Sequence, residues 1–136
     1  MKKVVLILPI LLLMISCLRF DTRLKIVNNS LENLNVDWDI DTIPTYPSIN
    51  NTEFYLSNPI LPYDTLQAVE DAQDGWERYL KNSKTGKLNL FIYRTDTIKK
   101  YGINRVLTHK MYKRLILSRQ ELDEFSWVIV IDGDSI

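Results

Sequence analysis

Hydrophobic and polar positions alternate most clearly in LNVDWDID, residues 34–41. One side of this pattern carries Leu34, Val36, Trp38 and Ile40. A period of two is typical of a β-strand with one buried and one solvent-facing side. The preceding stretch RLKIVNNS predicts another strand, and the turn-forming residues between the two favour a hairpin. In that hairpin, Arg23 and Lys25 would face the acids of the second strand.

Four further stretches predict strands: TLQAVE, KLNLFIYR (Lys87 to Arg94), MYKRLIL and WVIVI (Trp127 to Ile131). The last is a continuous apolar run rich in β-branched residues, which predicts a central strand covered on both faces. The neighbours of Trp38 and Trp127 are apolar, and we expect both rings to belong to the core.

Helices are expected to be short connectors. Residues Thr95 to Tyr101, closed by Gly102, predict one helix with Thr95 or Asp96 as its N-cap. DGWERYL reads as a turn followed by a helical or extended piece. In LSRQEL, Ser118 and Glu121 have the spacing of a capping box, and Leu117 and Leu122 that of a hydrophobic staple. This second helix should end near Phe125.

Four prolines interrupt a polar stretch from Asp41 to Pro62, which predicts a long loop or an edge excursion. Long ordered loops often carry function. Three aromatic residues in this loop are candidates for an exposed surface that contacts a protein or glycan partner: Tyr46, Tyr55 and Tyr63.

With 46% hydrophobic and 25% charged residues, the composition is that of an ordinary globular domain. Strands dominate the predicted elements. The expected fold is therefore mainly β, a single small β-sandwich-like domain with short connecting helices. An α+β sheet covered by those helices is the alternative.

The chain starts with a feature of exported proteins. Lys2 and Lys3 precede the apolar run from Val4 to Ile15, which is too short to span a bilayer but has the length of a signal peptide. The run ends in MISC, which resembles a bacterial lipobox with Cys17 as the lipidated residue. We therefore expect a signal peptide at residues 1–16, the lipidated cysteine and a short tether at 17–22, and one domain at 23–136.

Beyond the lipobox, the stretches IVNNS, GWERYL, LNLFIYRTDTIKKYG and LILSRQELDEFSWVIVI carry a wider resemblance. Together they are similar to small lipoproteins of unassigned activity from Bacteroides-type bacteria. The resemblance covers most of the chain after Cys17, but its motifs are structural. It implies an exported lipoprotein, and it supplies no catalytic residue.

Charge is segregated along the chain, although the formal net charge is zero. Residues 26–77 contain acids but no lysine or arginine, and nearly all charges from 78 to 119 are basic. Five of these bases could form an anion-binding or partner-binding face: Arg105, Lys110, Lys113, Arg114 and Arg119. The alternative, which near-zero net charge favours, is that the basic residues pair with the acidic first half of the same molecule.

Motifs for catalysis or cofactor binding are missing. The glycines are isolated, no G-x-S-x-G elbow occurs, and Cys17 is the only cysteine. The lone histidine, His109, reads as a surface or partly packed residue. Asp37, Asp39 and Asp41 begin like a calcium loop, but Thr42 and Ser48 stand where that loop needs Gly and Glu. We therefore expect no enzyme, no cofactor, no metal and no nucleic-acid partner.

The sequence thus predicts a lipid-anchored cell-envelope protein, placed at the outer membrane of a Gram-negative bacterium through acylated Cys17. Its expected role is that of an interaction or structural module. Two alternatives stay open: an inhibitor or immunity-type protein for a cognate toxin, and an unrecognised small envelope hydrolase.

Overall fold

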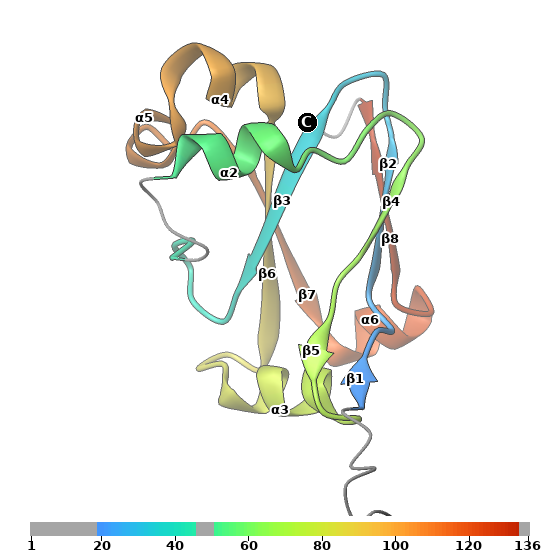
Figure 1. Ribbon diagram of the computed structural model, residues 1–136. Helices are drawn as coiled ribbons and strands as arrows, with labels where there is room; N and C mark the ends of the chain where they lie inside the picture. The colour runs from blue at the N-terminus through green and yellow to red at the C-terminus, as the bar shows by residue number, and fades with distance from the viewer. Residues whose placement is uncertain (1–18, 46–50, 134–136) are drawn as a thin grey trace, which may run out of the picture.

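The computed structural model describes residues 19–45 and 51–133, with 35% strand and 31% helix. Its strands are β1 (Phe20–Asp21), β2 (Lys25–Asn29), β3 (Leu34–Asp39), β4 (Thr65–Gln67), β5 (Glu70–Asp71), β6 (Lys87–Arg94), β7 (Lys113–Ser118) and β8 (Val128–Asp132). Its helices are α2 (Thr52–Ser57), α3 (Gly75–Asn82), α4 (Thr95–Tyr101), α5 (Ile103–Thr108) and α6 (Arg119–Glu124). The predicted class, a small mainly-β or α+β domain, is confirmed (Figure 1).

Two three-stranded sheets face each other across the main hydrophobic core (Figure 1). One has the order β4-β2-β8, in which β2 is antiparallel to β4 and parallel to β8. The other has the order β3-β6-β7 and is antiparallel throughout. Side chains of both sheets are buried in one cluster, among them Ile26, Leu90, Leu117 and Ile129. Burial of this apolar surface is the main stabilising term of the fold.

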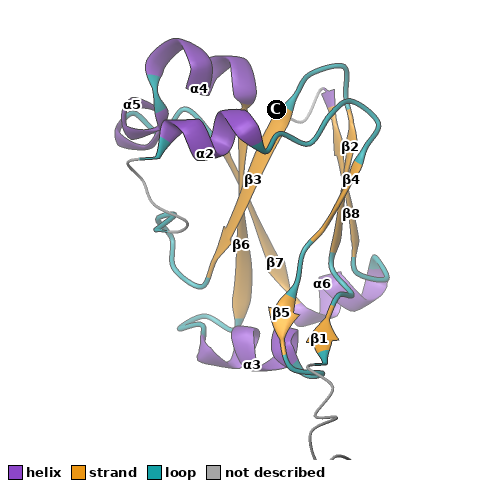
Figure 2. Ribbon diagram, in the orientation of Figure 1, coloured by secondary structure: helices purple, strands orange, loops and turns teal. Residues whose placement is uncertain are grey.

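A second, smaller core covers the outer face of the β3-β6-β7 sheet. Helices α2, α4 and α5 lie at one end of this sheet (Figure 2) and bury Tyr55, Ile98, Ile103 and Val106 against Phe91 and Tyr93 of β6. All of β6 except its two end residues is therefore buried. Strand β6, rather than the predicted stretch Trp127 to Ile131, is therefore the central strand that is covered on both faces.

Strand β8 differs from its prediction as a strand covered on both faces. Its residues alternate between exposed and buried, with Ile129 and Ile131 in the core and Val128 and Val130 facing outward. The strand lies at the edge of the β4-β2-β8 sheet, and no described helix covers the outer valines. A β-branched run thus indicated a strand correctly but overstated its burial.

The predicted hairpin between the first two long strands is wrong. The residues between β2 and β3 do turn, but they carry the chain from one sheet to the other. The side chain of Asn28 fixes this crossing, because its Nδ2 donates to the carbonyl oxygens of Glu32, Ile60 and Leu61. Local turn residues predict that a chain turns, and they cannot tell which strand it meets afterwards.

The proline-punctuated stretch is also more structured than expected. It contains α2, and Ile60 forms an isolated antiparallel bridge with Leu34 of β3. At the N-terminal side, Phe20 and Asp21, assigned above to the tether, form β1 and pair with β5. The folded domain therefore begins before residue 23.

Two helix starts test the capping predictions. Ser118 and Glu121 form the predicted capping box at α6, which ends at Glu124, one residue before the expected end. The bounds of α4 are as predicted, but its N-cap residue is Arg94 and makes no side-chain capping bond. Thr95 donates its hydroxyl to Asn35 Oδ1 instead, at 2.8 Å. In the described part of the chain, no helix is long and apolar enough to cross a membrane.

Candidate binding groove along strand β3

Strand β3 leaves part of its backbone unpaired at the outer edge of its sheet. Leu34 exchanges two backbone hydrogen bonds with Ile60 on this edge, at 3.1 and 2.7 Å. Because backbone groups of alternate residues point to the same side of a strand, those of Val36 and Trp38 also point outward, away from β6. Within the described residues, these outward N–H and C=O groups have no hydrogen-bond partner. Such an edge can accept an additional strand.

Two hollows lie beside this edge and share Trp38; together we call them the β3 groove. The apolar hollow has a volume of about 270 Å³, and its apolar lining consists of Val36, Trp38, Phe54, Tyr55, Ile60 and Leu66. The Trp38–Glu70 pocket has a volume of about 630 Å³, and its lining includes Trp38, Asp39, Thr45, Gln67, Glu70 and Tyr79. The groove therefore combines free backbone groups, apolar walls and carboxylates.

A buried carboxylate lies against the apolar hollow. Asp37 is 8% exposed, and its Oδ2 accepts a hydrogen bond from the Tyr55 hydroxyl at 2.7 Å. Burial raises the pKa of Asp37 to about 6, and the Tyr55 hydrogen bond offsets only part of that effect. The Tyr93 hydroxyl is buried without a partner in the described part of the chain, and burial and the charge of Asp37 raise its pKa.

Asp37 and Asp39 do not face solvent as a polar strand side should, whereas Asp41 is exposed. Asp37 faces the second core, and Asp39 accepts hydrogen bonds from Asp41 N and Thr45 Oγ1, at 3.0 and 2.6 Å. The predicted pairing of these acids with Arg23 and Lys25 is wrong, because Arg23 pairs with acids elsewhere and β2 belongs to the other sheet. Among the described residues, no group of three or more potential ligands could hold a metal.

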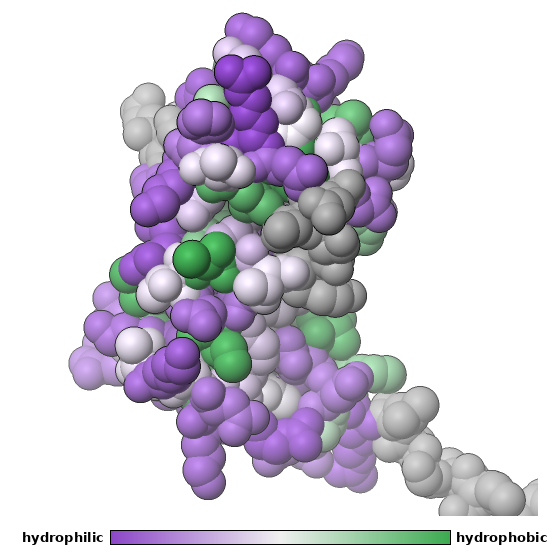
Figure 3. Space-filling view, turned by 90° about the vertical axis from the view of Figure 1, so that its left-hand side faces the viewer, coloured by the Kyte–Doolittle hydropathy of each residue, from purple (hydrophilic) through white to green (hydrophobic). Residues whose placement is uncertain are grey.

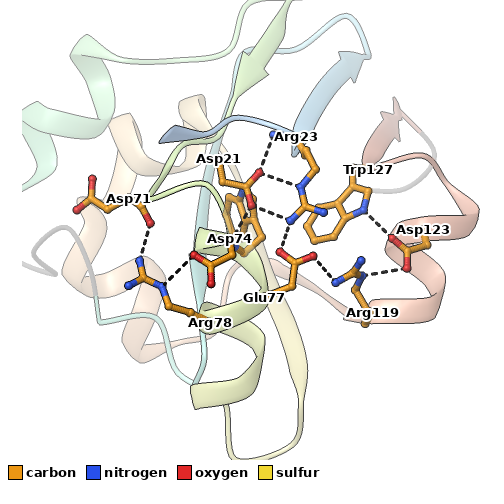
Figure 4. A network of polar contacts seen from close by, with 10 residues as sticks. Asp21, Arg23, Asp71, Asp74, Glu77, Arg78, Arg119, Asp123 and Trp127 are labelled. Carbon is orange, nitrogen blue, oxygen red and sulfur yellow. Dashed lines mark hydrogen bonds and ion pairs between the residues drawn. The ribbon is translucent and has the colours of Figure 1, made fainter. Parts of the chain in front are cut away.

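A second polar cluster, the Arg23–Glu77–Arg119 network, occupies the end of the domain near β1 (Figure 4). Glu77 of α3 pairs with both arginines, and Arg23 also binds Asp21 at 2.7 Å. The two guanidinium groups stack on Trp127, with Cζ atoms 4.4 and 5.3 Å from its ring centroid. Every charge in this cluster has a partner inside the molecule.

Trp127 adopts a backbone conformation that bulky residues rarely tolerate. Its φ is 62°, and that of the preceding Ser126 is 52°. The backbone N–H of Trp127 donates to Leu122 O at 2.7 Å, and its indole Nε1 donates to Asp123 at 2.8 Å. Ring stacking and these hydrogen bonds offset the local strain, so the network serves to hold α6, β8 and α3 together.

The predicted aromatic surface is only partly present. Tyr46 lies outside the described residues. Tyr55 is 2% exposed, so its prediction as an exposed residue is wrong: α2 turns it into the second core. Tyr63 is 67% exposed, as expected. Trp38 and Phe54 line the groove instead. The sequence alone could not predict this role, because it depends on β3 lying at the edge of its sheet.

The five predicted basic residues lie at both ends of β7. Arg119 is at the α6 end, inside the network, whereas Lys113 and Arg114 begin the strand next to the end of α5. Arg105 lies over the Tyr101 ring, and Arg114 donates to Thr42 O. Other bases pair with the acidic first half of the chain, as in the contacts Arg94–Glu32 and Lys84–Asp41. A binding role for Arg105, Lys110, Lys113 and Arg114 stays a prediction.

On the side of the molecule drawn in Figure 3, hydrophilic residues predominate and hydrophobic ones form small separate areas. His109 is exposed at the C-terminal end of α5. Cys17, the predicted lipidation site, lies outside the described residues.

Comparisons with protein-family models, with curated proteins and with solved structures found no match.

Proposed function

We propose that this protein is a membrane-tethered module of the cell envelope that binds an extended segment of a partner protein by adding it as a strand to β3. The observation that carries the proposal is the set of outward-pointing, unpaired backbone groups of Val36 and Trp38 beside the apolar hollow. Strand addition supplies affinity through main-chain hydrogen bonds and selectivity through pockets for alternate side chains.

The molecule already uses the start of this edge in the same way. Ile60 pairs with Leu34 in antiparallel register and seats its side chain in the main core, 5% exposed. A bound segment would continue along β3 where Ile60 stops. Its alternate side chains would then point into the space between the two sheets, where Val36, Trp38 and Leu66 lie.

The binding half of the proposal can be tested by photo-crosslinking with the full-length protein in intact envelopes. A photoreactive phenylalanine analogue replaces Phe54, which is 42% exposed and lines the groove. The matched control carries the analogue at Phe125, which directly follows α6 and is 52% exposed. We expect adducts at position 54 that a capped peptide of alternating threonine and valine competes away, and no such competition at position 125.

The same adducts from both positions, or adducts insensitive to the peptide, would exclude the groove as the binding site.

The tether is tested separately. Cys17→Ala should move the protein from the membrane fraction to the soluble fraction or stall its processing. Because stable anchoring depends on buried acyl chains, unchanged membrane attachment of this variant would refute lipidation at Cys17.

A further inference from the structure

We infer that the segment bound along β3 carries a lysine or arginine whose cationic group enters the Trp38–Glu70 pocket. This inference rests on the strand addition proposed above and specifies the chemistry of the bound segment. Three observations support it: an unneutralised carboxylate, aromatic walls, and the distance between the two hollows along the strand.

Glu70 supplies the carboxylate. One oxygen accepts a hydrogen bond from the Trp38 indole Nε1 at 3.2 Å, and the carboxylate forms no ion pair with any described residue. Burial raises the pKa of Glu70, so its charged form is incompletely solvated and would gain from a cation. The nearby base, Arg78, is directed to Asp74 and to Asp71 O, as Figure 4 shows.

Gly75 explains how Glu70 reaches this position. A Cβ atom on Gly75 would lie 2.6 Å from the Cβ of Glu70, closer than two such atoms can approach. The glycine at the start of α3 therefore lets this helix pack directly against β5. The helix therefore positions the backbone and Cβ of Glu70, and the carboxylate accepts its hydrogen bond from Trp38.

The aromatic walls of the pocket belong to Trp38 and Tyr79. Tyr79 lines the pocket together with Asp39 and Glu70. Burial, followed by the charges of these two carboxylates, raises the pKa of Tyr79. No lysine, arginine or histidine is among the described residues that line the pocket. An aromatic face beside a carboxylate favours an alkylammonium or guanidinium group through cation–π attraction and ion pairing.

The spacing along the strand connects this pocket to the apolar hollow. Val36 and Trp38 are two residues apart, which corresponds to about 7 Å along a strand. A paired segment that points one side chain into the apolar hollow would point the side chain two positions away toward Trp38 and Glu70. The expected motif is an apolar residue and a cationic residue separated by one position.

Three capped heptapeptides test the inference with the purified full-length protein in detergent. The first has the sequence Thr-Val-Thr-Lys-Thr-Val-Thr, so that a valine stands two positions from the lysine in either direction. In the second, glutamine replaces the lysine. The third keeps the lysine but is N-methylated at the lysine and at both valines, the alternate residues whose amide hydrogens would point toward β3. Isothermal titration measures each affinity.

We expect the lysine peptide to bind about tenfold more tightly than the glutamine peptide, because only the lysine can pair with a desolvated carboxylate. Glu70→Gln should weaken the lysine peptide about fivefold and leave the glutamine peptide within about twofold. The matched control is Glu124→Gln, which removes the same charge from an exposed site on α6. It should leave both affinities within about twofold.

The outcomes separate the inference from the function on which it rests. Equal binding of the lysine and glutamine peptides, lost on N-methylation, would keep strand addition and overturn the cationic motif. A lysine preference that survives Glu70→Gln would also overturn it. No binding of any peptide, or binding insensitive to N-methylation, would overturn both. The comparison between peptides needs only the unmodified protein, so it remains decisive if Glu70→Gln does not fold.

Discussion

The carboxylates of the Arg23–Glu77–Arg119 network and those of the β3 groove have pKa values shifted in opposite directions. In the network, burial alone would raise the pKa of Asp21, but hydrogen bonds from Arg23 and from the Trp76 N–H lower it below its usual value. The hydrogen bond from Arg23 lowers the pKa of Glu77. At the groove, burial raises the pKa of both Asp37 and Glu70.

The difference separates a structural cluster from a candidate binding site. Charges that are neutralised within the molecule hold its own elements together and leave little to offer a ligand. A half-buried carboxylate without a cation, beside unpaired backbone groups, would gain further stabilisation from a bound cation. Both clusters combine acids with aromatic residues, and the different pKa directions of their carboxylates are the reason that we propose a binding role for the groove alone.

Removal of the aromatic ring on which the network stacks should reduce the stability of the protein more than any other change to the network. Trp127→Ala deletes a ring that is 6% exposed and on which two arginines stack. We expect the free energy of unfolding to fall by about 3–5 kcal/mol, the usual cost of truncating a buried tryptophan. Urea denaturation followed by circular dichroism measures it. Phe125→Ala, at a neighbouring ring that is 52% exposed, serves as the control and should cost far less.

The opposite pKa directions predict opposite effects of pH on stability. The pKa of Asp37 is raised to about 6 in the folded protein, so this group binds a proton more readily when folded than unfolded. Its contribution to stability should therefore increase as the pH falls from about 7 to about 4, by up to about 3 kcal/mol. Asp21 and Glu77, with lowered pKa values, should lose their contributions as the pH falls.

Asp37→Asn isolates the first effect. Urea midpoints of the variant and the wild type, measured from pH 4 to pH 8, should differ most at high pH, where only the wild type keeps a buried charge. Asp96→Asn, at an exposed carboxyl group on α4, is the control. If the difference between Asp37→Asn and the wild type were constant across this range, Asp37 would not titrate as described.

The position of Glu70 can be disturbed without touching its charge. Gly75→Ala places a methyl group 2.6 Å from the Glu70 Cβ, and overpacking of this kind costs about 1–3 kcal/mol. The variant should also bind the lysine peptide less tightly, because the carboxylate is displaced. Gly133→Ala is the matched control: its new Cβ would meet Ser30 at an ordinary 3.8 Å. Unchanged unfolding of Gly75→Ala would show that α3 and β5 can separate without cost.

The smallest effect is expected from the ion pairs of the network. Glu77→Gln removes a partner of Arg23 and Arg119, but these side chains are all more than a third exposed. Solvent and salt screen such pairs, so we expect a loss of only about 0.5–1 kcal/mol at low salt. The loss should shrink in 1 M NaCl, since the screening length there is about 3 Å. A larger loss that persists at high salt would mean that Glu77 acts through packing.

How far the sequence predicts this molecule depends on whether a feature is local. The strand Lys87–Arg94 and the helix Thr95–Tyr101 have the bounds that their residues predicted, and the capping box of α6 is present. These features depend on neighbours a few positions apart in the chain. The site could be predicted only in fragments: Trp38 was recognised as a strand residue, whereas its place beside Glu70 depends on contacts across 32 positions.

The sequence by itself determined most of the longer strands and helices α4 and α6, because backbone preferences and capping interactions act over a few residues, but it did not predict α2 and α5. It also carries the lipobox-like start from which the membrane tether is proposed. Only the tertiary structure decided which strand faces were covered. Helices α2, α4 and α5 buried the polar side of β3 and turned Tyr55 inward, while β8 kept one face in solvent. Burial is a property of the whole fold, and the alternation of residues along one strand does not predict which other elements pack against its faces.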